Sequence, residues 1–184
     1  MLRRVIKRVA KQTIKGVLAP FGMRPYRHDI GDYMSRWILI HPGGTVRLHN
    51  IRREDADNDL HDHPWDFVSI ILRGGYIEEV PKNPLDRAGQ GGTEFITYTP
   101  GCVNVVSAED SHRIDLVMDN RLDPLEPGET GVWTLVFAGN YKRGWGFWSR
   151  YSGKFIPWRV YTNSKPGVDV SEYEARLKEV GVVE

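Results

Sequence analysis

The sequence holds one cysteine, Cys102, in 184 residues. One cysteine excludes an internal disulfide and a zinc site built from several thiolates, and it fits a reducing compartment, so we expect a cytoplasmic protein. No apolar run approaches the about 20 residues that a transmembrane helix needs. A P-loop, a dinucleotide-binding glycine pattern and a nucleophile elbow are also missing, which excludes the commonest phosphate-binding and serine-hydrolase motifs.

Acidic residues are missing from positions 1–28, where the charged residues are Lys and Arg, although the net charge of the whole chain is only +1. Apolar residues from Leu2 to Leu18 recur there at helical spacing, which predicts a basic amphipathic helix that ends before Pro20. We expect the apolar face to pack on the protein and the basic face to stay in water. Contact of this helix with nucleic acid or a membrane surface is an alternative that we do not favour.

The rest of the sequence is typical of a mainly β domain, because many short strands without intervening helices indicate an antiparallel sandwich or barrel. A capping box at 171–174 predicts a short C-terminal helix. We therefore expect one domain, with the basic helix and a linker in 1–28, a barrel in 29–165 and the C-terminal helix in 166–184. Strands are predicted at Trp37–Ile40, Thr45–Ile51, Asp66–Leu72, Tyr76–Val80, Thr93–Tyr98, Cys102–Val106, His112–Met118, Val132–Ala138 and Phe155–Tyr161.

The segment His61-Asp62-His63 places two imidazoles at positions i and i+2. Alternate side chains of an extended strand share one face. Two neutral imidazoles on one face can bind a divalent transition metal from one side and leave its other side open. We therefore regard His61 and His63 as candidate metal ligands, with Asp62 on the opposite face.

The spacing after these histidines resembles the first motif of the cupin superfamily, which reads H-x-H, three or four residues, Glu, six residues and Gly. At the four-residue spacing, Val68 stands in the glutamate position and Gly75 in the glycine position. Phe67 stands at the three-residue spacing. The histidines and the glycine therefore match, and the glutamate does not.

The second cupin motif reads G-x5-P-x-G-x2-H. Gly101 and His112 fall in register with its first and last positions, whereas Ser107 and Glu109 replace the usual proline and glycine. The resemblance covers about residues 45–140. It implies a cupin-type jelly-roll barrel with a metal inside.

By this resemblance, His61, His63 and His112 are the metal ligands. Because Val68 replaces the glutamate, two ligand sets remain open. Three histidines alone would be similar to the cysteine dioxygenase branch, and we favour this set. Asp66 is the alternative, either as the carboxylate of a site with two histidines and one carboxylate or as a residue behind the ligands. The expected cofactor is a divalent transition metal, with Fe(II) favoured and Zn, Ni or Mn as alternatives.

Further candidate residues lie on or beside the predicted strands. An inward arginine would hold a carboxylate or phosphate through two parallel hydrogen bonds. The aromatic segment Trp145-Gly146-Phe147-Trp148 could wall a pocket or pack in the core. The candidate catalytic residues are Tyr98, Arg73 and Arg113, with Arg47 as a further inward arginine, and the candidate pocket walls are Trp65, Trp145 and Trp148.

The function expected from these features is that of a mononuclear iron-dependent dioxygenase acting on a small polar or thiol-bearing substrate. A metal-assisted isomerase or lyase of sugars or keto-acids is one alternative. A second is a non-catalytic ligand-binding module attached to a partner through the basic helix, since one fold hosts many functions. A homodimer is also open. The sequence further resembles uncharacterised cupin proteins of bacteriophage and bacterial genomes.

Overall fold

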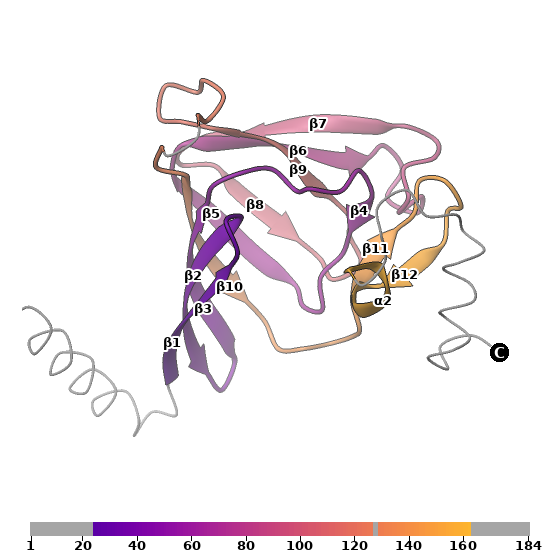
Figure 1. Cartoon of the computed structure of the whole chain (residues 1–184). Coiled ribbons are helices and arrows are strands. Elements are labelled where there is room, and N and C mark those ends of the chain that lie inside the picture. Colours follow the sequence, from indigo (N-terminus) through magenta and orange to yellow (C-terminus); the bar gives the residue numbers. More distant parts are fainter. Residues whose placement is uncertain (1–23, 127–128, 163–184) are drawn as a thin grey trace, which may run out of the picture.

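The described part of the chain is built almost entirely from antiparallel strands (Figure 1). The structure is a computed structural model that describes residues 24–126 and 129–162. The largest sheet has six strands in the order β1-β2-β3-β10-β5-β8. Its members are β1 (Arg24–Ile30), β2 (Met34–His41), β3 (Gly44–Ile51), β10 (Val132–Ala138), β5 (Phe67–Arg73) and β8 (Val103–Val106).

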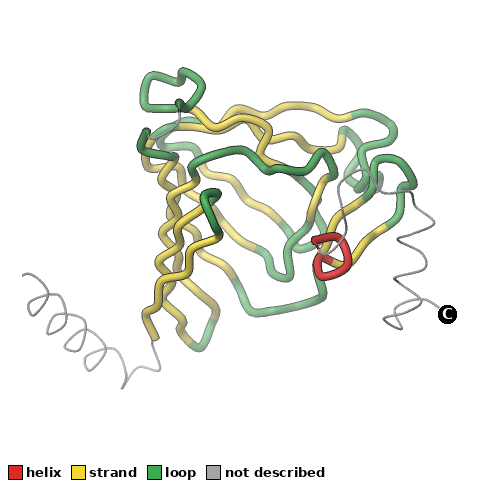
Figure 2. Tube along the Cα trace, in the orientation of Figure 1, coloured by secondary structure: helices red, strands yellow, loops and turns green. Residues whose placement is uncertain are grey.

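Two smaller sheets complete the barrel-like arrangement, and Figure 2 shows how loops connect all three sheets around a common centre. One has the order β7-β6-β9 and the other β12-β11-β4. The strands are β7 (Thr93–Tyr98), β6 (Gly75–Pro81), β9 (Arg113–Met118), β12 (Phe155–Pro157), β11 (Gly146–Trp148) and β4 (Leu60–His61), and a short helix, α2 (Trp158–Thr162), follows β12.

The mainly β architecture predicted from the sequence is confirmed, and the predicted strands Thr93–Tyr98 and Val132–Ala138 match their bounds. The expectation of a strand at Phe155–Tyr161 was wrong beyond Pro157, where α2 begins instead. Proline has no N–H for the ladder and its fixed φ suits the start of a helix, so α2 begins directly after Pro157. Three strands were not predicted, namely β1, β4 and β11.

The basic helix predicted within 1–28 and the helix predicted in 166–184 lie outside the described residues, which begin at 24 and end at 162. The residues 24–28, which we expected to be linker, lie in β1. Over the described ranges, no helix is long and apolar enough to cross a membrane.

Strand alternation divides the six-stranded sheet into an inner and an outer face. Met34 of β2 pairs with Ile51 of β3, and Ile51 pairs in turn with Val132 of β10. All three side chains are buried in the main apolar cluster together with Ile71 and residues of the β7-β6-β9 sheet. The main apolar core therefore lies between the six-stranded sheet and the β7-β6-β9 sheet.

Asp62 anchors the segment that carries His61 and His63. Its side chain is fully buried. It accepts hydrogen bonds from the Gly146 amide at 2.9 Å, from Trp148 Nε1 at 3.1 Å and from Arg143 at 2.9 Å. A buried carboxylate is tolerated when hydrogen bonds and an opposite charge replace its lost water. Asp62 therefore faces away from its neighbouring histidines, as strand alternation predicts, and ties them to β11.

We predict that replacing Asp62 by alanine destabilises the fold, because Arg143 would keep its partly buried charge without the carboxylate. The expected loss is on the order of 3 kcal/mol in the free energy of unfolding, measured by urea denaturation. Asp66→Ala is the matched control, because Asp66 lies on the surface, and it should change stability by less than about 0.5 kcal/mol. Equal stability of the two variants would contradict the anchoring role of Asp62.

Candidate metal centre

His61 and His112 are brought together by their backbones. They form an isolated antiparallel bridge, in which each amide donates to the other carbonyl at 2.9 Å. Residues paired in this way project their side chains on the same side of the ladder. Their ring centroids lie 4.9 Å apart. The bridge thus places two side chains side by side that are far apart in the sequence.

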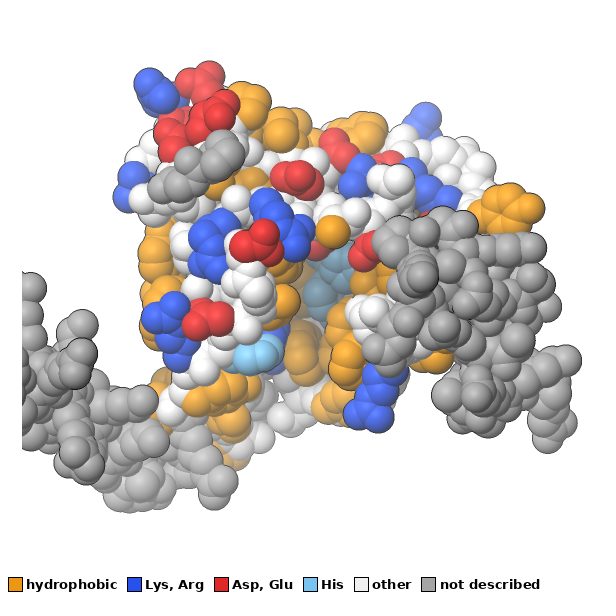
Figure 3. Space-filling view, viewed as in Figure 1, with side chains coloured by type: hydrophobic (Ala, Val, Ile, Leu, Met, Phe, Trp, Pro, Cys, Tyr) orange, Lys and Arg blue, Asp and Glu red, His pale blue; other side chains and the backbone are white. Residues whose placement is uncertain are grey.

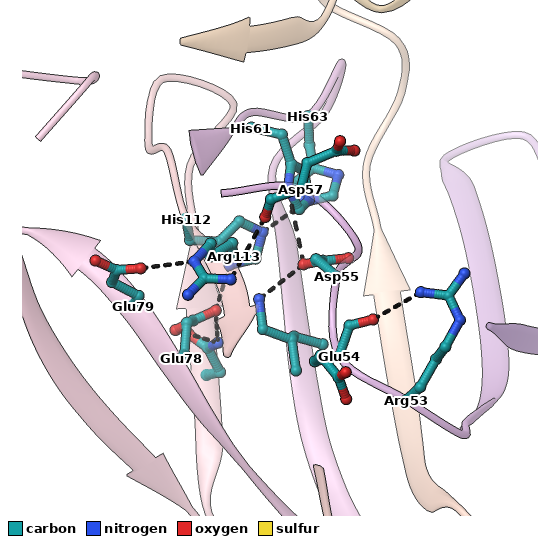
Figure 4. Close-up of polar contacts among 12 residues, drawn as sticks. Arg53, Glu54, Asp55, Asp57, His61, His63, Glu78, Glu79, His112 and Arg113 are labelled. Carbon is teal, nitrogen blue, oxygen red and sulfur yellow. Dashed lines mark hydrogen bonds and ion pairs between the residues drawn. The ribbon is translucent and has the colours of Figure 1, made fainter. Parts of the chain in front are cut away.

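His63 completes the cluster from the loop that follows β4. Its Nε2 lies 2.7 Å from Nε2 of His112. One ligand atom from each of His61, His63 and His112 can be chosen so that all lie within 4.8 Å of one another. Figure 4 shows the three imidazoles gathered above Glu78 and Asp55. The three histidines singled out by the cupin spacing therefore converge in the folded chain.

Val68, which stands in the cupin glutamate position, does not line the central cavity. Phe67 and Ser69 line the central cavity, so the intervening Val68 points to the other face of β5. Val68 pairs there with Val105 and Phe137, which are both exposed. The inward residue beside the histidines is Phe67, whose ring lies 4.9 Å from that of His63. A phenyl ring thus occupies the space next to the ligand candidates.

A carboxylate does reach the cluster, but it comes from β6. Glu78 is buried and forms a short ion pair with Nδ1 of His112. Both its carboxylate oxygens accept from Asn104 Nδ2 at 3.1 Å. If Nδ1–H of His112 donates to Glu78, its Nε2 keeps the lone pair that faces His63. Glu78 therefore orients His112 instead of joining the three nitrogens.

Asp55 occupies a similar position behind His61. Its Oδ2 lies 3.9 Å from His61 Nδ1 and accepts a hydrogen bond from the Ile114 amide at 2.7 Å. The Asp55 amide in turn donates to the Ile114 carbonyl at 2.9 Å. Ile114 follows His112 by two residues, so this contact couples the Asp55 loop to β9. Two of the three histidines thus have an acidic residue at their Nδ1 side.

Burial governs the protonation of the cluster. Burial lowers the pKa of His61, although the charge of Asp55 partly offsets it. Burial and the neighbouring histidines depress the pKa of His63 well below its usual value. Burial also acts to lower the pKa of His112, but the charge and hydrogen bond of Glu78 outweigh it and leave that pKa raised. His61 and His63 are therefore neutral at pH 7 and offer lone pairs.

This arrangement fits a divalent transition metal. Neutral imidazole nitrogens are the favoured ligands of Fe(II), Ni and Zn, and a second hydrogen bond to a carboxylate commonly fixes the ring of a ligand histidine. Glu78 supplies that bond to His112. The Nε2 atoms of His63 and His112 lie within hydrogen-bond distance, at 2.7 Å, so two potential ligand atoms are already close together. His61, His63 and His112 would hold the ion, with no carboxylate among the ligand atoms of this group.

The histidines form part of the wall of a central cavity with a volume of ≈ 130 Å³. Figure 3 shows histidine side chains deep in a hollow at the centre of the visible face, with Lys and Arg side chains near its rim. Trp65 and Phe67 line the cavity beside the histidines, and Arg36, Arg47 and His49 line it from β2 and β3. The cavity therefore joins the metal-ligand candidates to a basic wall.

Asp66, the alternative ligand, lies away from the cluster. It forms an ion pair with Lys142 and accepts a hydrogen bond from the Ala108 amide at 2.9 Å. The lysine bond, followed by the backbone bond, lowers the pKa of Asp66. The structure groups the three histidines without Asp66.

The three candidate catalytic residues do not line the central cavity. Arg73 is exposed at the end of β5. Arg113 binds Glu79 at 2.6 Å and also pairs with Asp115. Tyr98 lines a separate hollow that reaches His112 from the other side, and burial and the charge of Glu78 raise its pKa to about 12. Tyr98 interacts with Glu78, the residue that orients His112.

Of the three candidate pocket-wall residues, only Trp65 lines the central cavity. Trp65 lines the cavity and has the guanidinium of Arg47 over its ring at 4.1 Å. Trp145 stacks on Trp158 of α2 with centroids 5.6 Å apart. Trp148 donates to Asp62. Trp145 and Trp148 therefore pack in the β12-β11-β4 sheet and support the histidine segment from behind.

Sequence reasoning missed several residues that the fold adds to the site. Glu78 had a detectable signal, since a charged residue sits at an alternate position of the predicted strand Tyr76–Val80. Arg36 and His49 had no comparable signal, since each is flanked by one polar and one apolar residue in its strand. Which face of those strands points inward depends on the pairing of distant strands, and that pairing was unknown.

No family model matches the chain, and no curated protein matches it. Among solved structures it is similar to hydroxypropylphosphonic acid epoxidase from S. wedmorenis, with TM-score 0.41, 10% identity and coverage of 61% of this chain and 55% of the epoxidase. KdgF from Halomonas sp. has TM-score 0.40 and 17% identity over 62% of this chain and 86% of its own. An RmlC-like cupin from Shewanella frigidimarina has TM-score 0.38 and 13% identity over 64% and 86%.

The chain therefore spans about half the length of the epoxidase that it matches. The resemblance to cupins rests on the chain itself, because the histidines that match both motifs meet inside a β-barrel-like fold. That resemblance is confirmed.

We predict that Glu78→Gln weakens metal binding by about 10- to 100-fold, because the amide keeps the shape but loses the charge that orients and supports His112. The measurement is competition with a chelator of known affinity, using Zn or Fe(II). Asp66→Asn is the control and should bind metal as the unchanged protein does. Complete loss of metal in Asp66→Asn, with an intact fold, would instead make Asp66 a ligand.

We also predict that His49 makes the metal-free fold less stable in mild acid. Burial, followed by the charges of Arg36 and Arg47, lowers the pKa of His49 from 6.5 to about 3. Between these values the unfolded chain binds a proton that the folded chain does not, so stability falls as pH drops from about 6.5 towards 3. From pH 6 to pH 5, His49→Gln should lose less stability than the unchanged protein, by up to about 1.4 kcal/mol in urea unfolding. Parallel pH profiles would contradict this.

Proposed function

We propose that this chain is a mononuclear metal-dependent enzyme, using Fe(II), that oxygenates a small polar or thiol-bearing substrate. The observation that carries the proposal is the convergence of His61, His63 and His112 on one point of a cavity wall, with a phenyl ring where a carboxylate ligand was expected. Neutral ligands leave the full charge of a dication available to a substrate.

An Fe(II) ion bound there would supply open coordination positions for a substrate and for dioxygen. The residues of the chain prepare that position. Glu78 fixes the ring of His112, and Asn104 holds the carboxylate of Glu78. Phe67 closes one side of the histidine cluster with an apolar surface that excludes water. Such a supported histidine set, opening on a cavity, favours an enzyme over a purely structural barrel.

We expect the iron-loaded protein to consume oxygen when given the right small substrate. The test is oxygen uptake by protein loaded with Fe(II) under anaerobic conditions, across a panel of thiols, amino acids and keto-acids. His112→Ala should reduce uptake to the level of metal-free protein, because it removes a ligand. His41→Ala is the matched control, because His41 lies at the end of β2, outside the histidine cluster, and accepts a bond from the nearby Gly43 amide; it should retain both metal and uptake.

Two outcomes would replace this proposal. If no compound stimulates uptake and the metal-free protein still binds a ligand of the panel with unchanged affinity, the chain is a ligand-binding module. If the metal-loaded protein instead isomerises or cleaves a sugar or keto-acid without oxygen, it is the isomerase or lyase that the sequence left open.

A further inference from the structure

The inner face of β2 and β3 carries charged and polar side chains where a barrel interior is normally apolar. Arg36 of β2 pairs with His49 of β3, and Arg47 follows at the next inward position of β3. All three line the central cavity. Arg47 is 7% exposed, which is rare for an arginine without a charged partner.

These arginines have no carboxylate partner among the residues described. Arg47 donates from Nε to Thr45 at 2.8 Å and stacks on Trp65, and no acidic residue pairs with it there. Arg36 contacts His28, an imidazole with no negative charge. By contrast, Arg53 and Arg113 each pair with an acidic side chain. The wall formed by Arg36, Arg47 and His49 therefore holds uncompensated positive charge.

Polar atoms on this wall also lack hydrogen-bond partners. Arg36 Nε and His49 Nε2 are both buried without a partner in the described part of the chain. A buried donor or acceptor left unpaired costs about 1–3 kcal/mol, so such groups usually mark a position filled by a ligand or an ordered molecule. Arg36 Nε and His49 Nε2 belong to cross-strand partners, so one bound group could pair with both atoms.

The wall and the histidine cluster open on the same cavity. Trp65, which carries Arg47 on its ring, follows His63 by two residues. A cross-strand row runs from Arg47 through Val136 and Ser69 to Asn104, the residue that holds Glu78. A small molecule in this cavity could therefore touch the basic wall at one end and the histidines at the other.

An oxyanion satisfies every feature of this wall. Its charge would offset the repulsion between the two guanidinium groups, which sit in an interior where charges interact strongly. Its oxygens would accept from Arg36 Nε and from the terminal nitrogens of Arg47, and guanidinium forks match carboxylate and phosphate geometry. His49 could donate Nε2–H in its neutral form. An apolar or cationic ligand would leave these groups unpaired.

We propose that Arg36, Arg47 and His49 form an oxyanion subsite that binds the carboxylate, phosphonate or phosphate group of the substrate. The substrate is then a small acid whose second functional group faces His61, His63 and His112. The placement of that second group rests on the proposed function, whereas binding of the anion by the basic wall does not.

The test uses the metal-free full chain, so that anion binding is measured without any contribution from a metal. Inorganic phosphate, methylphosphonate and acetate are titrated separately by calorimetry, and the ¹H–¹⁵N signals of arginine Nε–H groups are followed by NMR. We expect at least one anion to bind with shifts of the Arg36 and Arg47 signals. The preferred anion identifies the substrate group as phosphate-like or carboxylate.

Substitutions locate the site. Arg47→Gln and Arg36→Gln should each weaken anion binding by about 10- to 100-fold, the effect of losing a charge-assisted hydrogen bond. Arg121→Gln, at an exposed arginine paired with Asp119, should bind as the unchanged protein does. If Arg47→Gln fails to fold, Arg47→Lys keeps a charge but not the fork, and its binding should be intermediate.

The outcomes separate this inference from the proposed function. If no anion binds, or if Arg36→Gln and Arg47→Gln bind as tightly as the unchanged protein, the oxyanion subsite is wrong, whatever the metal does. If anions bind at the arginines but Fe(II) does not bind or supports no oxygen uptake, the subsite stands and the oxygenase proposal fails.

Discussion

The site depends on one backbone pairing, the antiparallel bridge between His61 and His112. Two hydrogen bonds of 2.9 Å join residues that are distant in the sequence and place their imidazoles on the same side. His63 can join them only because Asp62 is held on the opposite side by Gly146, Trp148 and Arg143. The geometry of the metal centre is therefore set by the main chain and by one buried carboxylate behind it.

Charge is distributed unevenly around the cavity. On the histidine side, Glu78 and Asp55 lie at the Nδ1 atoms of His112 and His61, where each carboxylate acts to raise the pKa of its ring. On the β2 and β3 side, Arg36 and Arg47 have no acid beside them among the described residues. Each side thus suits a different part of one ligand, a metal-binding group and an anionic group.

The strands that carry the site were largely predictable, because alternation and turn residues are local signals. The strands of β5, β6, β9 and β10 followed from such patterns, and the cupin spacing identified His61, His63 and His112. The short strands β4 and β11 were not predictable, since strands of two or three residues have no repeat to detect. Their pairing is nevertheless what supports the histidines from behind.

The sequence by itself determined the mainly β class and the identity of the three histidines, because both depend on short-range spacing. Only the tertiary structure decided that Glu78, and not Asp66, brings a carboxylate to His112. It also decided that Arg36 and Arg47 face the cavity while Arg73 lies in solvent. Alternation says which residues share a face of a strand, but the face that points inward is set by pairing between strands distant in the sequence.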